Sequence, residues 1–192
     1  EANHRFRPEI VKKMAELGFF GCALPEEYGG NGFGFLESVI CAEQIAKVSG
    51  SWRLPFNMQN IGPAVTVNKF GTEEQKKKFL VPLASGEMIG AFALTEPQAG
   101  SDAAALQARA KRVDGGYLIS GTKQFITSGT IAGAVIVFAV TDADAGKKGM
   151  SAFLVPAGTE GMRVSGIEHK LGQEASDTVQ LSFENAFVAE DH

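Results

Sequence analysis

Residues 92–102 read Phe92-Ala93-Leu94-Thr95-Glu96-Pro97-Gln98-Ala99-Gly100-Ser101-Asp102, and the pattern of the chain changes here. The stretch begins as an apolar run typical of a β-strand and ends in small and polar residues. Proline fixes φ and lacks an N–H, and glycine reaches conformations that other residues avoid, so the strand has to end at Pro97 and Gly100. Thr95 and Ser101 then place hydroxyls on a strand-to-loop edge. Such an edge can bind the polar edge of a ring or a phosphate, although many ordinary turns also carry Ser, Asp and Gly.

Upstream of this stretch, apolar residues recur at helical spacing. Four helices are predicted, from Pro8 to Gly18, from Phe35 to Val48, from Pro55 to Gly71 and from Thr72 to Gly86. Thr72 and Gln75 match a capping box, in which each side chain binds the backbone N–H of the other residue. In the second helix we expect four side chains to point inward, those of Leu36, Val39, Ile40 and Ala46. Residues 1–88 are therefore predicted to form an all-helical domain.

From residue 89 onward the pattern has a period of two, as in β-strands. Strands are predicted over residues 89–95, 106–110, 117–127, 134–140, 150–155, 162–167 and 178–183. Asp114-Gly115-Gly116 signals a hairpin turn, and Gly121 indicates a bulge. No helical period interrupts the strands, so residues 89–192 are predicted to form an antiparallel β-barrel or sandwich. The predicted class is α+β, with a helical first domain and an antiparallel second domain.

The composition of the 192 residues indicates a folded protein, because 44% of them are apolar and 21% are charged. The net charge is −4 and the basic residues are scattered, which argues against nucleic acid as a partner. No apolar segment approaches the roughly 20 residues that span a bilayer, so no membrane association is expected. Three scattered histidines give little support to a metal site or to a Ser-His-Asp triad.

Cys22 and Cys41 are the two cysteines, and they do not form a Cys-x-x-Cys pair. We expect both to be small buried residues of a protein from a reducing compartment. The sequence leaves a disulfide between them open.

Residues 92–102 resemble the flavin-loop signature of the acyl-CoA dehydrogenase family, in which an apolar strand runs into Thr-Glu-Pro-x-Ala-Gly-Ser-Asp. Three further segments resemble the family in the same order, namely Pro25-Glu26-Glu27-Tyr28-Gly29-Gly30, Gly71-Thr72-Glu73-Glu74-Gln75-Lys76 and Gly121-Thr122-Lys123-Gln124-Phe125-Ile126-Thr127-Ser128. The resemblance covers essentially the whole chain. It corresponds to the N-terminal helical domain and the middle β domain of the family, without the C-terminal helical domain.

The resemblance implies that seven residues bind FAD, namely Phe92, Leu94, Thr95, Ser101, Phe125, Ile126 and Thr127. Thr127 matches the position that reaches flavin N5, and Phe125 matches an aromatic position that covers one face of the ring, where many relatives carry Trp. Ser101 matches a position that touches the bound acyl-CoA or the cofactor, and an ordinary turn serine is the alternative.

Two acidic residues are interpreted separately. Glu96 lies inside the signature, and we expect it to be a structural hydrogen-bond partner, because a Glu before Pro on a loop edge usually has that role. Glu174 stands where the family commonly has Arg, so any anion contact of that arginine is in doubt here.

The resemblance implies an FAD-dependent acyl-CoA dehydrogenase that desaturates the α,β bond of an acyl-CoA thioester with hydride transfer to flavin N5. The catalytic base is expected beyond residue 192, so the chain alone is expected to be inactive. Expected partners are acyl-CoA, an electron-transferring flavoprotein and further copies in a homotetramer, in the bacterial cytoplasm or the mitochondrial matrix. The alternatives are an acyl-CoA oxidase or a flavin monooxygenase of the same fold, and a non-catalytic truncated scaffold.

Overall fold

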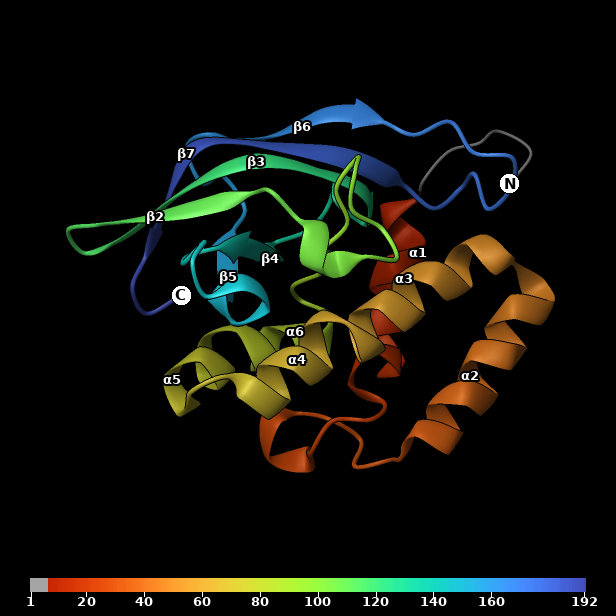
Figure 1. Cartoon of the computed structure of the whole chain (residues 1–192). Helices are drawn as coiled ribbons and strands as arrows, with labels where there is room; N and C mark the ends of the chain where they lie inside the picture. Colours follow the sequence, from red (N-terminus) through yellow and green to blue (C-terminus); the bar gives the residue numbers. More distant parts are fainter. Residues whose placement is uncertain (1–6) are drawn as a thin grey trace. The chain divides into compact units, whose positions relative to one another are not determined.

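A computed structural model describes residues 7–192 and divides them into two compact units (Figure 1). One unit holds the described part of Glu1–Ala91 together with His169–Asp177. The other holds Phe92–Glu168 and Thr178–His192. Among the described residues, no helix is long and apolar enough to cross a membrane.

The first unit is helical, as the sequence predicts. Its main helices are α1 (Pro8–Glu16), α2 (Phe35–Val48), α3 (Gly50–Ile61), α4 (Pro63–Phe70), α5 (Glu73–Gln75) and α6 (Val81–Ser85), with the π-helical segment η3 (Lys76–Leu80) between the last two. The capping box is confirmed, because Gln75 N–H donates to Thr72 Oγ1 at 3.2 Å and Thr72 N–H donates to Gln75 Oε1 at 3.0 Å. Gly86 ends α6 with a φ of 74°, a left-handed conformation that favours glycine.

The third predicted helix is wrong in its bounds. The structure has two helices in its place, and the first of them begins at Gly50, so that Pro55 lies inside it. The break falls at Gly62-Pro63, where proline occupies the first position of α4. Proline suits that position because the first N–H groups of a helix have no partner within the helix.

The prediction for the inward face of α2 is also wrong. Leu36, Val39 and Ile40 are 69%, 62% and 50% exposed, and Ala46 is exposed as well. The one buried residue of α2 is Ser38. Helical spacing identifies an apolar face, but it does not say whether another part of the described chain covers that face.

Two buried side-chain amides of α3 bind backbone groups of other segments of the helical unit. Gln59 Nε2 donates to the carbonyl oxygens of Leu83 and Met88, both at 2.8 Å, and Gln59 Oε1 accepts from Gly90 N–H at 2.7 Å. Asn60, next in the helix, donates to the carbonyl oxygens of Phe19 and Phe56 and accepts from Cys22 N–H. Every backbone group that these amides bind would otherwise need another partner.

The second unit contains one curled sheet with the character of a half-barrel, which confirms the predicted class. The strands of the sheet are β1 (Gly90–Ala93, of which Phe92 and Ala93 belong to this unit), β2 (Arg109–Val113), β3 (Gly116–Thr127), β4 (Ala134–Val140), β5 (Met150–Pro156), β6 (Met162–Ile167) and β7 (Thr178–Ala189). The order is β1-β4-β2-β3-β7-β6, and β5 pairs with β4. The β2–β3, β3–β7, β4–β5 and β6–β7 pairs are antiparallel, and β2 meets β4 in a parallel bridge at Arg109 and Val140.

The predicted hairpin and bulge are confirmed. Val113 pairs with Gly116 across the turn, in which Gly115 has a φ of 74°. Gly121 has a φ of 148°, and the register between β3 and β7 shifts beside it. β7 continues to Ala189 rather than ending at Phe183, because it stays paired with β3 as far as Gly116. β2 begins at Arg109, three residues later than predicted.

Both cysteines are free thiols, and no disulfide joins them. Burial raises the pKa of the Cys41 thiol above its ordinary value of 9.0, and the neighbouring Cys22 thiol raises it further. Cys22 itself is buried.

We expect Cys41 to react slowly with iodoacetamide at pH 7 and faster as the pH rises past 9, because only the thiolate is the nucleophile. Mass spectrometry of the native protein against pH measures the rate, with Cys41→Ser as the control that locates the label. A rate at pH 7 equal to that of a free cysteine peptide would contradict the expectation.

Candidate functional site

The two threonines that the sequence singles out follow or end strands of the second unit. Thr95 lies two residues after β1, and Thr127 is the last residue of β3. The backbone joins these segments, because Gln124 N–H donates to the Thr95 carbonyl oxygen at 2.9 Å. Both threonines are half-buried. The structure therefore brings the Thr95 segment beside the end of β3.

The end of β3 has an unusual backbone. Phe125 and Ser128 have φ values of 60° and 63°, in the left-handed region that non-glycine residues rarely adopt. The register between β3 and β7 shifts between Lys123 and Ile126. Strained residues of this kind persist where the surrounding structure holds them, and they cluster at functional sites. The strain brackets Thr127.

The predicted flavin-binding residues of this strained segment differ in their exposure. Phe125 is 58% exposed, so its ring is available to a ligand, whereas Ile126 is buried in the core. Any contact of Ile126 with a ligand would therefore come from its backbone. Ser128 Oγ is buried and has no hydrogen-bond partner among the described residues.

The other predicted residues occupy different surroundings. Phe92 is half-buried, and its ring lies against Phe138 with the centroids 5.1 Å apart. The Leu94 carbonyl oxygen accepts from Lys123 Nζ at 3.1 Å. Ser101 is exposed in the loop before a short helical turn at Ala103–Ala105.

A buried ion pair that sequence reasoning missed lies beside the two threonines. Lys123 Nζ is 2.7 Å from Glu96 Oε1, and neither side chain is more than 2% exposed. Glu96 also accepts from the backbone N–H groups of Gln107, at 2.6 Å, and Ala108, at 3.0 Å, and from the Gln98 side chain, at 2.6 Å. The expectation that Glu96 is a structural hydrogen-bond partner agrees with this environment. Lysine in a strand is usually solvent-facing, so sequence pattern gives no signal for Lys123.

The surroundings of Glu96 favour its charged form. Burial alone would raise the pKa of Glu96, but hydrogen bonds from Lys123 and from the backbone N–H groups of Gln107 and Ala108 outweigh it and hold the pKa below the ordinary value of 4.5. Burial lowers the pKa of Lys123, and Glu96 offsets part of that effect. A carboxylate with so many donors is a poor proton acceptor at neutral pH.

Acid should therefore destabilise the protein through Glu96. Its pKa is lower in the folded than in the unfolded state, so the unfolded state binds more protons and stability falls as the pH drops below about 4.5. Urea midpoints between pH 7 and pH 3 measure the effect, and the acid slope should be shallower in Glu96→Gln/Lys123→Met, which removes the carboxylate without leaving the Lys123 ammonium unpaired in the core. An identical slope in the two proteins would contradict this role of Glu96.

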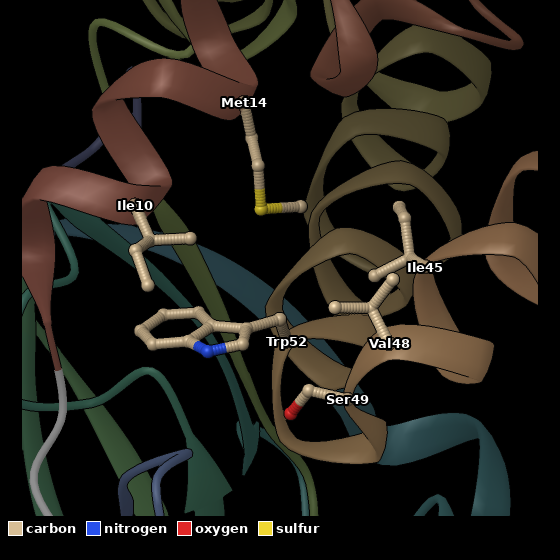
Figure 2. Close-up of a pocket in the computed structure, with 6 residues that line it drawn as sticks. All are labelled: Ile10, Met14, Ile45, Val48, Ser49 and Trp52. Carbon is tan, nitrogen blue, oxygen red and sulfur yellow. The ribbon is translucent and has the colours of Figure 1, made fainter. Parts of the chain in front are cut away.

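The first unit contains a separate apolar pocket of about 600 Å³ (Figure 2). Six residues of α1, α2, α3 and the turn between the last two line it, namely Ile10, Met14, Ile45, Val48, Ser49 and Trp52. Figure 2 shows Ile10 over the indole ring of Trp52. None of these six side chains is titratable, so the pocket can accept an apolar group but offers no acid or base from its lining. Within the described residues, no three His, Cys, Asp or Glu side chains gather as a metal site would require.

Comparison with known proteins identifies both halves of the chain. Residues 1–87 match the family model described as acyl-CoA dehydrogenase, N-terminal domain, and residues 91–186 match the model described as acyl-CoA dehydrogenase, middle domain. A short-chain-specific acyl-CoA dehydrogenase of Clostridium acetobutylicum is 43% identical over 188 residues, which are 98% of this chain and 50% of that protein.

Solved structures agree with the sequence match. Butyryl-CoA dehydrogenase from Megasphaera elsdenii superposes with a TM-score of 0.96 at 36% identity, over 100% of this chain and 51% of that one. An acyl-CoA dehydrogenase from Bacillus anthracis complexed with FAD superposes with a TM-score of 0.88 at 36% identity, over 95% of this chain and 31% of that one. The chain spans about half the length of the curated relatives it matches. With these matches the resemblance is confirmed, and the chain belongs to the acyl-CoA dehydrogenase family.

Proposed function

We propose that the protein is an FAD-dependent acyl-CoA dehydrogenase, which introduces a double bond between the α and β carbons of an acyl-CoA thioester. The observation that carries the proposal is the pairing of the Thr95 segment with the strained end of β3 through Gln124 N–H. Residues 1–88 would form the helical domain and residues 89–192 the flavin-binding β domain. The two family models, which meet near residue 90, support this division.

The residues present fit a flavin. An isoalloxazine ring needs hydrogen bonds along its polar edge and an apolar cover for its face. Thr95 and Thr127 supply hydroxyls, and the exposed ring of Phe125 supplies a face that can stack. The Ser128 hydroxyl, which is buried without a hydrogen-bond partner in the part of the chain that the structure describes, is a further polar group in the same segment. FAD, when bound there, supplies the acceptor for two electrons as a hydride.

The residues of this chain have binding and orienting roles in the proposal. Phe92 in β1 and Leu94, the residue after β1, would contact the flavin partly through their backbone, and Ile126 would contribute its backbone between Phe125 and Thr127. Ser101 would touch the acyl-CoA or the cofactor from its exposed loop. Glu96 is committed to Lys123 and two backbone N–H groups, so it would not serve as the base that removes the α-proton. By the family resemblance, that base would come from residues beyond 192.

Partners follow from the proposed reaction. The protein would take an acyl-CoA as substrate and pass electrons to an electron-transferring flavoprotein. It would act as a homotetramer. The two free thiols fit a reducing compartment, which would be the bacterial cytoplasm or the mitochondrial matrix.

The test is anaerobic titration of the intact protein, purified with FAD, against a panel of acyl-CoAs. We expect the flavin absorbance to bleach with at least one of them, and no bleaching with any would overturn the proposal. Peroxide release in place of dye reduction would identify an oxidase or a monooxygenase. Failure of the intact protein to hold FAD would indicate a scaffold. A protein limited to residues 1–192 should not turn over.

A further inference from the structure

We propose that Lys123 and Glu96 are positioning residues for the flavin site, and that their ion pair holds the Thr95 segment and the end of β3 in the arrangement that the ring requires. The inference rests on the proposed function. Neither residue is assigned a contact with the cofactor, so both act through the backbone that they hold.

The contacts of Lys123 straddle Thr95. Its Nζ donates to the carbonyl oxygen of Leu94, at 3.1 Å, and to the carboxylate of Glu96, at 2.7 Å, which are the residues on either side of Thr95. The next residue, Gln124, donates its N–H to Thr95 itself. One end of β3 therefore holds three consecutive residues of the 94–96 segment.

Glu96 extends the same network to a third segment. Its two oxygens accept from the N–H groups of Gln107 and Ala108, which lie immediately before β2. The carboxylate thus ties the loop that contains Ser101 back to the point where the loop leaves Thr95. Three separate stretches of the chain meet at one charge pair.

The strained backbone near Lys123 suggests a role for the Lys123–Glu96 ion pair other than stabilising the fold. Phe125 and Ser128 occupy the left-handed region, which costs free energy and persists only where the surroundings impose it. Lys123 anchors the strand on one side of that region, at the residue where the register begins to shift. A buried ion pair is a weak stabiliser compared with apolar residues of similar volume. Its position between the two threonine-bearing segments fits a geometric role.

The test is the double variant Glu96→Gln/Lys123→Met of the intact protein, which removes both charges and leaves neither alone in the core. We measure the Kd of FAD for the apoprotein, the visible absorption spectrum of bound FAD, and the thermal midpoint of the apoprotein. We expect FAD to bind about 10- to 100-fold more weakly, because the variant would displace the groups that meet the ring, and a displacement of about 1 Å can cost an enzyme about 100-fold in rate. The flavin band should also shift, because its hydrogen bonds change.

Two further variants make the outcome decisive. Arg163→Gln/Glu184→Gln removes an exposed ion pair of the same unit, with N···O 2.8 Å, and should leave affinity and spectrum unchanged. Glu96→Asp keeps both charges but shortens the link, and should weaken FAD binding with a thermal midpoint close to that of the wild type.

If the wild type holds no FAD, the proposed function fails and this inference with it. If the wild type holds FAD, and Glu96→Asp and the double variant match its affinity and spectrum, the positioning role is overturned and the proposed function stands. The role is also overturned if affinity falls only in proportion to the thermal midpoint, because that result describes a purely structural pair.

Discussion

Replacing Lys123 alone with methionine should destabilise the protein by about 3–5 kcal/mol at pH 7, because it leaves the Glu96 carboxylate buried without its cation. The ammonium is completely buried, so water does not replace it without local opening. The Leu94 carbonyl oxygen loses its donor at the same time. The Gln107 and Ala108 N–H groups remain bound to Glu96, and they offset only part of the loss.

Urea denaturation of the apoprotein at pH 7 measures the change in the free energy of unfolding. Adding Glu96→Gln to Lys123→Met should restore part of the lost stability, because no charge is then left unpaired in the core. A loss below about 1 kcal/mol in Lys123→Met is the size that exposed ion pairs contribute. It would mean that water reaches the pair.

Replacing Gln59 with leucine should cost about 3 kcal/mol or more in the helical unit, because three backbone groups lose their partners together. The carbonyl oxygens of Leu83 and Met88 and the N–H of Gly90 all bind this one amide. Leucine has a similar volume, so the cost arises from unsatisfied polar groups and not from a cavity.

Gln44→Leu is the matched control, because Gln44 is exposed on α2. A surface change of this kind is usually within about 0.5 kcal/mol of neutral. Urea midpoints of the two variants and the wild type decide the question. Equal midpoints for Gln59→Leu and Gln44→Leu would show that other groups satisfy the three backbone atoms.

Features encoded by neighbouring residues were predictable from the sequence. The capping box of Thr72 and Gln75 spans four residues, and the Asp114-Gly115 turn spans two, so each carries its full signal locally. The bulge at Gly121 was predictable because a glycine inside a strand pattern often marks a bulge or a close approach of backbone. The exposure of the apolar side of α2 was not predictable, since periodicity describes a helix and not its neighbours.

The candidate site was predictable only in part. Thr95 and Thr127 stand out because motif and strand end coincide there. Lys123 does not, because its partner lies 27 residues away in the chain and a strand lysine normally faces water. The left-handed backbone at Phe125 was equally hidden, because an aromatic residue in a strand pattern indicates extended backbone.

A Cβ added at Gly121 would lie 2.7 Å from the Cα of Ala108, with backbone that cannot move aside as a flexible side chain would. Ala108 donates its N–H to Glu96, and Gly121 stands two residues before Lys123. A missense change at position 121 would therefore disturb both partners of the ion pair at once. In a mutational screen, we expect a substitution at Gly121 to weaken FAD binding as substitutions at the proposed FAD-binding residues do, although Gly121 is not itself proposed to contact FAD.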